Sequence, residues 1–237
     1  MYVTRKTYIK QDTKLADVFF ENPYLLIIME HFGYDYVIGK DKKIAEVARD
    51  NNVSTQLFLD ILNLYNGFIE LKHQFYTRDD ASRLIFFLKN AHQYYIQEKY
   101  PEVKQGIESL YNKNRTNELK LVYVFFESYF KEVLEHLEYE DKVAFPYFLQ
   151  VLHADDQALK NYSVKTYCNH HSDIETKIAE LKRLLIKHIP ITNDNTIRRK
   201  LIISLFELEY DLKIHSVLEE KVLIPIITSY EKTKLLF

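Results

Sequence analysis

HLEYEDKVAFP, residues 136–146, and HSVLEEKVLIP, residues 215–225, are two versions of one motif. Their shared frame is His-x-x-x-Glu-acid-Lys-Val-apolar-apolar-Pro. A histidine and a glutamate four residues apart leave the same face of an α-helix. The repeat therefore predicts two helices that each present one imidazole and one carboxylate side by side.

These side chains are the ligand types of transition-metal sites. Two helices that face each other with such pairs bring two histidines and two glutamates into a bundle core, where they can hold a carboxylate-bridged pair of metal ions. Because each carboxylate has two oxygens, each glutamate can bridge both cations. The motif predicts metal ligands at His136, Glu140, His215 and Glu219.

Two more histidines fall at the same level of the predicted helices. His92 precedes the polar turn at Asn114 by as many positions as His136 follows it, and the same holds for His171 and His215 on either side of Asn193. At ~1.5 Å per residue these arms have equal lengths of ~33 Å, so their ends lie side by side. The histidines predicted to share one layer are His92, His136, His171 and His215.

Alternatives remain at some of these positions. His170 is the fallback for His171, because adjacent helical residues point about 100° apart and only one of them can face the core. His171 is favoured by the apolar residues Ile178, Leu181 and Leu185 behind it. Asp141 and Glu220 are expected at solvated helix ends, where they pair with the neighbouring lysines. His31, His73, His153 and His188 are expected to be ordinary surface or packed histidines.

Apolar spacing predicts an all-α chain. Four long helices are expected at about 81–111, 118–151, 163–188 and 197–230, the first with an interruption at Pro101. Their short connections favour an up-down four-helix bundle over residues 79–237. Residues 1–70 are expected to form a small helical N-terminal domain. The chain has 4 Gly and 5 Pro, which argues against turn-rich β-sandwiches and glycine-rich phosphate loops.

Charge and cysteine content narrow the function classes. The formal net charge is −2, so no basic field attracts nucleic acid. Cys168 is the one cysteine, which rules out an intramolecular disulfide and a cysteine-based metal site within the chain, and which fits a reducing compartment. No signal-peptide core and no apolar stretch long enough for a bilayer are found. We therefore expect a cytoplasmic protein that binds neither nucleic acid nor membranes.

From His92 onward the sequence resembles the hemerythrin-like cation-binding domain, and more closely the bacterial di-iron proteins for repair of iron centres, the RIC family. Glu140 and Glu219 are each followed by a proline six residues later, as in that family. The resemblance implies two iron ions, with manganese able to use the same ligands. The implied ligands are His92, His136, Glu140, His171, His215 and Glu219, with both glutamates bridging.

The N-terminal region also resembles the small first domain of that family. The segment from Leu15-Ala16-Asp17 through Gly33-Tyr34-Asp35-Tyr36 carries this likeness. Where the family usually has a Cys-Cys pair, this chain has Val37-Ile38. The thiol chemistry of that domain is therefore not expected here, and the chain resembles a divergent subfamily.

The resemblance implies a non-haem di-iron protein of the nitrosative or oxidative stress response, which acts in iron–sulfur cluster repair. Its expected partners are damaged iron–sulfur proteins, with O₂ and NO as small ligands. An alternative is an O₂, NO or redox sensor that signals through the N-terminal domain. A third reading is an interaction protein whose metal only stabilises the bundle. The sequence indicates no nucleophile–base arrangement, so catalytic residues stay unassigned.

Overall fold

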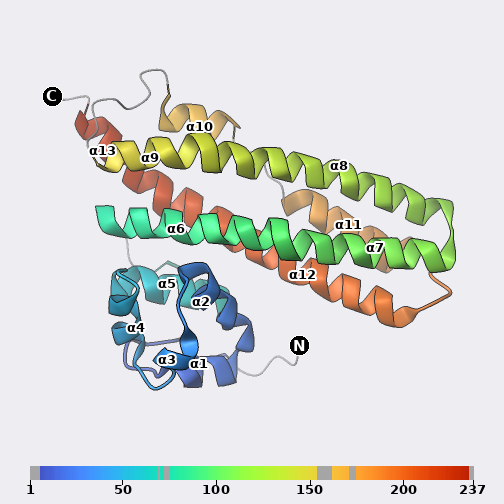
Figure 1. The fold of residues 1–237 in the computed structure, drawn as a ribbon, viewed down its shortest axis with the longest axis horizontal. Helices are drawn as coiled ribbons and strands as arrows, with labels where there is room; N and C mark the ends of the chain where they lie inside the picture. Colours follow the sequence, from blue (N-terminus) through green and yellow to red (C-terminus); the bar gives the residue numbers. More distant parts are fainter. Residues whose placement is uncertain (1–5, 69, 72–74, 154–161, 171–174, 235–237) are drawn as a thin grey trace. The chain divides into compact units, whose positions relative to one another are not determined.

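The computed structural model describes residues 6–68, 70–71, 75–153, 162–170 and 175–234 (Figure 1). Within these ranges every regular element is a helix, and one isolated antiparallel bridge joins Lys14 and Lys43. The predicted all-α class is confirmed.

The chain forms two compact units. The first comprises residues 1–91, 147–164 and 216–237, and the second comprises residues 92–146 and 165–215. The borders of these units cross long helices. They do not decide the predicted boundary between residues 70 and 79, which stays a prediction.

Short helices make up the N-terminal part of the first unit. They are α1 (Leu15–Glu21), the 3₁₀ turn η1 (Pro23–Leu25), α2 (Leu26–Phe32), α3 (Tyr36–Gly39), α4 (Ile44–Asp50) and α5 (Thr55–Tyr65). Gly33 ends α2 with a φ of 65°, a left-handed conformation that glycine adopts without strain. Ser54 caps α5 by accepting a hydrogen bond from the backbone N–H of Leu57. These local signals explain why the predicted helical region forms.

Helix α6 (Arg78–Tyr94) packs its first part against these short helices. Arg83 donates to the carbonyl of Phe32 at 2.8 Å, and Asn90 donates to the carbonyl of His31 at 2.8 Å. Phe87 is buried and its ring lies 4.9 Å from that of Phe32. The start of α6 thus belongs to the same core as the N-terminal helices. His31 lies in this core, as a packed histidine.

Val37 and Ile38 lie on α3, and both side chains are largely exposed. They present apolar groups to solvent at the position where the family resemblance would place thiols.

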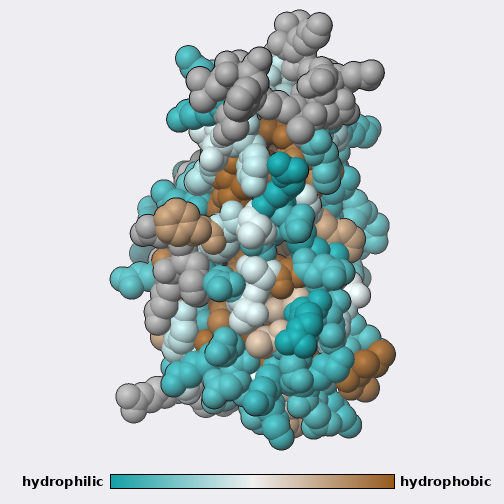
Figure 2. Space-filling model, turned by 90° about the vertical axis from the view of Figure 1, so that its left-hand side faces the viewer, coloured by the Kyte–Doolittle hydropathy of each residue, from teal (hydrophilic) through white to brown (hydrophobic). Residues whose placement is uncertain are grey.

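Figure 2 shows one face of the molecule, in which hydrophilic residues cover much of the described surface and hydrophobic areas are visible between them.

The second unit is built from longer helices. These are α7 (Tyr100–Asn114), α8 (Asn117–Tyr139), α11 (Glu175–Lys187) and most of α12 (Asn195–Leu218). Arg115, with a φ of 53°, ends α7, and Thr116 caps α8 through the N–H of Leu119. The turn expected near Asn114 lies at Arg115 and Thr116, between α7 and α8.

Side chains link these helices pairwise. Lys104 of α7 pairs with Glu127 of α8 at 3.0 Å, Glu132 of α8 pairs with Lys177 of α11, and Lys182 of α11 pairs with Glu209 of α12. Gly106 of α7 lies so close to α12 that a Cβ there would meet Leu201 at 3.1 Å. Each of the four helices therefore contacts the next one in the order α7, α8, α11 and α12.

Three further helices complete the described chain. They are α9 (Phe145–Leu152), α10 (Val164–His170) and α13 (Ile224–Lys234). Within the first unit, Glu231 of α13 accepts hydrogen bonds from the Tyr147 hydroxyl and from the backbone N–H of Val164.

Candidate metal centre

Three π-helical segments interrupt the long helices near the predicted ligands. They are η2 (Tyr95–Lys99), η3 (Glu140–Ala144) and η4 (Glu219–Leu223). Glu140 is the first residue of η3, and Glu219 is the first residue of η4. His92 lies one turn before η2. Single-turn π segments inside α-helices often occur at functional sites.

A proline follows each π segment, and it explains the change of winding. Tyr100, Phe145 and Ile224 each donate their backbone N–H to the carbonyl five residues back, instead of four. Each of these residues directly precedes a proline, at Pro101, Pro146 and Pro225. Proline has no N–H, and its ring clashes with the carbonyl four residues earlier, so a wider turn relieves the clash. The interruption predicted at Pro101 is thus a π segment.

Four of the predicted ligands form one buried cluster. His92, Glu140, His215 and Glu219 each offer one ligand atom, and these atoms all lie within 4.8 Å of one another. The cluster joins parts of the chain that are remote from one another in sequence. Buried carboxylates and imidazoles need compensating partners. The four residues therefore lie close enough to bind a metal ion.

His92 and His215 point the same type of nitrogen at each other. Their Nε2 atoms are 3.1 Å apart. Two imidazole nitrogens that bind one ion at ~2.1 Å, at roughly a right angle, are separated by ~3 Å. The observed spacing of these two histidines thus matches a shared metal ion.

Asp141 fixes the orientation of His92. The Nδ1 atom of His92 lies 3.1 Å from Oδ1 of Asp141. An ionised carboxylate can only accept, so Nδ1 carries the proton and Nε2 is left with a lone pair toward the cluster. Carboxylate partners of this kind are typical of metal-ligating histidines.

Glu140 is fully buried and faces two different histidines. Its Oε2 lies 3.4 Å from Nε2 of His92, and its Oε1 lies 3.3 Å from Nε2 of His136. The buried hydroxyl of Tyr167 donates a hydrogen bond to Oε1 at 2.9 Å. One carboxylate thus lies between two imidazoles that belong to different helices.

Aromatic rings cover the imidazoles. Phe145 stacks on His92 with ring centroids 5.5 Å apart, and Tyr95 meets His215 edge-on at 5.7 Å. Tyr95 and Phe145 are fully buried. They exclude water from the nitrogen atoms that face the cluster.

Of the remaining predicted ligands, His136 lies beside Glu140 with 9% of its side chain exposed. His171 lies outside the described residues, as does the side chain of the alternative His170.

The expected role of Asp141 is wrong. The sequence predicts that it is solvated and pairs with Lys142, but it contacts His92, and Lys142 pairs with Glu138. Sequence reasoning also gives no role to Tyr167. A weak signal for Tyr167 is its position one turn before the predicted ligand His171.

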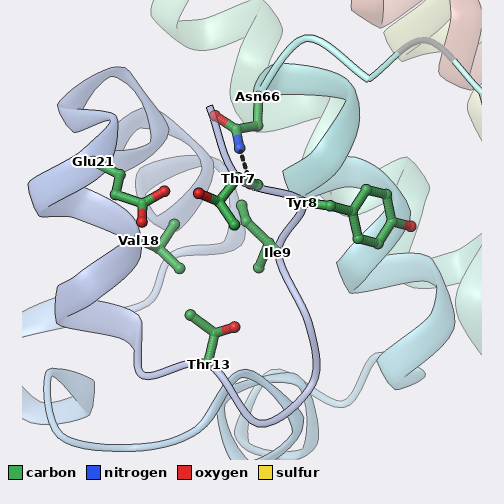
Figure 3. A pocket seen from close by; sticks show the side chains of 7 residues that line it. All are labelled: Thr7, Tyr8, Ile9, Thr13, Val18, Glu21 and Asn66. Carbon is green, nitrogen blue, oxygen red and sulfur yellow. Dashed lines mark hydrogen bonds between the residues drawn. The ribbon is translucent and has the colours of Figure 1, made fainter. Parts of the chain in front are cut away.

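The N-terminal part of the described surface contains a small hollow. It measures about 40 Å³ and is lined by Val18, Glu21 and Asn66, among others, and Asn66 donates to the carbonyl of Thr7 at 2.9 Å (Figure 3). Pockets for drug-sized ligands measure about 300–1,000 Å³. This hollow has room only for water-sized molecules.

No protein-family model matches this chain, and the comparison with curated proteins finds no match. The likeness to hemerythrin-like proteins therefore rests on the residues quoted above. None of the described helices combines the length and the apolar character that crossing a bilayer requires.

Proposed function

We propose that this chain is a non-haem metalloprotein whose helices form a four-helix bundle around a carboxylate-bridged pair of metal ions, with iron as the expected metal. One observation carries the proposal: the two oxygens of Glu140 face His92 and His136, at 3.4 Å and 3.3 Å. A bridging carboxylate needs this arrangement, because each oxygen must serve a different ion.

The proposed ligands divide into two sets. His92 and His215 would hold one ion, together with Glu140 and Glu219, which agrees with the cluster of four. His136 and the predicted ligand His171 would hold the second ion with the same two glutamates. Iron in such a site supplies redox chemistry and open coordination positions for small molecules such as O₂ or NO.

The chain's own residues prepare this site. Asp141 holds the proton of His92 on Nδ1, and Tyr167 fixes Oε1 of Glu140 by a hydrogen bond. Phe145 and Tyr95 keep water from the imidazoles. These contacts reduce the motion of the ligands before any metal binds.

For the cellular role we propose work in the nitrosative or oxidative stress response, with repair of damaged iron–sulfur proteins as the activity. The support is the repeated motif and its likeness to the family for repair of iron centres. The alternative is an O₂, NO or redox sensor.

Metal analysis of the purified protein tests the proposal. After anaerobic iron loading and exposure to air, we expect about two irons per chain and the near-ultraviolet charge-transfer bands of a bridged ferric pair. The double variant Glu140→Ala with Glu219→Ala should bind no pair. Glu138→Ala is the matched control, since Glu138 is an exposed neighbour on the same helix that pairs with Lys142.

Full occupancy in the double variant would refute the bridging role of the two glutamates. Failure of the wild-type protein to take up any metal would refute the metalloprotein itself. With the metal established, recovery of an inactivated iron–sulfur enzyme by the iron-loaded protein would support repair. Failure to restore it, with an NO-dependent change of oligomeric state, would favour the sensor.

A further inference from the structure

Asp211 is a buried carboxylate that the proposed metal centre does not use. Its side chain lies on α12 and is 1% exposed. Neither of its oxygens has a hydrogen-bond partner. Buried carboxylates without partners are unfavourable, and their retention in a core points to a partner that binds during function.

The position of Asp211 on α12 links the surface to the proposed centre. Glu207, Asp211, His215 and Glu219 follow one another at intervals of four residues. Residues at this spacing are neighbours on a helix, about 6 Å apart along its axis. Each member can coordinate a divalent cation. The series therefore places potential ligand groups one turn apart along one helix face, from Glu207 to His215 and Glu219.

Several carboxylates lie near the exposed end of this series, at Glu207. Lys99 is buried and donates to Glu102 at 3.1 Å and to Glu207 at 2.9 Å. The pKa of the nearby Tyr94 is raised, first by burial and then by the negative charges of Asp211, Glu102, Glu207 and Glu98. The negative charges of these carboxylates act on the phenol, and Lys99 pairs with two of them, Glu102 and Glu207.

Exposure falls along the same path. The side chains of Glu102 and Glu207 are 58% and 38% exposed, whereas Asp211 is buried. Glu102 also lines a groove of about 180 Å³ between α7 and α12, together with Lys200. Ser204 lines this groove as well, is itself buried without a partner for its hydroxyl, and stands two turns before Asp211. The groove therefore brings solvent to a point on α12 two turns before Asp211.

We propose that Asp211 is a transit site for divalent cations. Ions gather at Glu102 and Glu207, are held by the carboxylate of Asp211, and move one helical turn further to His215. Where negative side chains outnumber positive ones, their field can raise the local concentration of cations and their association rates by about 10- to 1,000-fold. The inference rests on the proposed metal centre as its destination.

Uptake of Co²⁺ by the metal-free full-length protein tests this route, because Co²⁺ reports its binding by visible absorption. Asp211→Asn should slow the initial uptake about tenfold or more, and final cobalt content should equal that of the wild type. Added salt should slow the wild type more than the variant. Glu209→Gln is the matched control, as it lies on the same helix and pairs with Lys182 instead.

The melting temperature of the metal-free variant shows whether Asp211 acts in ion transit or only stabilises the fold. Asp211→Asn removes a buried charge without partners, so the metal-free variant should melt at the wild-type temperature or above it. A lower melting temperature together with slower uptake would overturn the transit site, as would an unchanged uptake rate. A reduced final cobalt content would also overturn it, because Asp211 would then be a resident ligand. If the wild type takes up no cobalt, the metal centre itself falls, and the route falls with it.

Discussion

Asp141 and Lys142 are neighbours in sequence, yet their charged groups serve different purposes. Asp141 contacts the imidazole of His92, whereas Lys142 pairs with Glu138 at the surface. Successive helical residues point about 100° apart, so a single step along the chain separates a group that orients a ligand from one that meets solvent. At the residue scale, the site depends on such directions more than on composition.

Tyr167 gives a test at this scale. Tyr167→Phe removes the hydroxyl that donates to Oε1 of Glu140 and keeps the ring. Loss of such supporting contacts weakens metal affinity by about 10- to 100-fold, and we expect a loss in this range when affinity is measured by competition with a chelator. Tyr111→Phe is the control, because Tyr111 packs on Arg115 near the end of α7. Equal affinities of Tyr167→Phe and the wild type would assign the hydrogen bond no part in metal binding.

At the scale of elements, the prolines and π segments shape the site. A straight α-helix would rotate Phe145, which stacks on His92, relative to Glu140, since a π turn adds one residue to the helix without a matching turn. The three segments share the same hydrogen bond from the residue before proline. The prolines thus change the winding next to the buried cluster, although none of them belongs to it.

Pro146→Ala tests this effect. Alanine restores the N–H and removes the ring clash, so we expect α8 and α9 to join more regularly and metal affinity to fall by about tenfold or more. The melting temperature of the metal-free protein should not fall, because proline disfavours a helix interior. Pro190→Ala, in an exposed loop, should change neither quantity. An unchanged metal affinity in Pro146→Ala would show that η3 does not contribute to metal binding.

A second element-scale prediction concerns the start of α12. Lys113 and the N–H of Ile197 hold the pKa of Asp194 below its ordinary value. A carboxyl with a lowered pKa stabilises the fold above its unfolded pKa of about 3.9 and loses this effect as the pH falls further. Asp194→Asn keeps the helix cap but removes the charge. Its melting temperature should lie below that of the wild type above pH 5, by no more than about 2 °C, and the difference should vanish toward pH 3. A difference that persists at pH 3 would point to the cap instead of the charge.

At the scale of the whole molecule, the cluster joins segments that are remote in sequence. His92, Glu140 and His215 come from three separate parts of the chain. A metal that binds all of them binds only the folded chain, so its binding free energy adds to the stability of the fold.

Metal removal should therefore lower stability. At a free metal concentration 100 times the dissociation constant, binding adds about 2.7 kcal/mol, which corresponds to a rise in melting temperature of roughly 5–10 °C for a chain of this size. Calorimetry with and without a chelator measures this shift. The double variant Glu140→Ala with Glu219→Ala should show none. An equal melting temperature of the wild type in both states would contradict metal binding by the folded chain.

Periodicity predicted the helices well, because it depends on local sequence. The helix expected at 118–151 corresponds to α8 and α9 with η3 between them. The i, i+4 motif likewise led to Glu140, His215 and Glu219, which the structure brings together with His92.

Contacts between helices were harder to predict. The pairing of His92 with Asp141 joins two segments that are far apart in sequence, and it depends on how two helices are rotated against each other. The same holds for Tyr167 and Glu140. The π segments were missed because apolar spacing hardly changes over a single wide turn, and because proline in a helix also produces simple kinks.

The three wide turns should also make amide hydrogen exchange of the backbone sensitive to metal binding. The amide protons of Tyr100, Phe145 and Ile224, which directly follow η2, η3 and η4, are held by bonds to the fifth carbonyl back, in a winding that is less favourable than the α-helix. Such local weak points open more often than the helices around them. Deuterium should therefore enter these three stretches early in the metal-free protein and late once the ligands are held. Mass spectrometry of their peptides would then follow the filling of the centre without any spectroscopic signal from the metal.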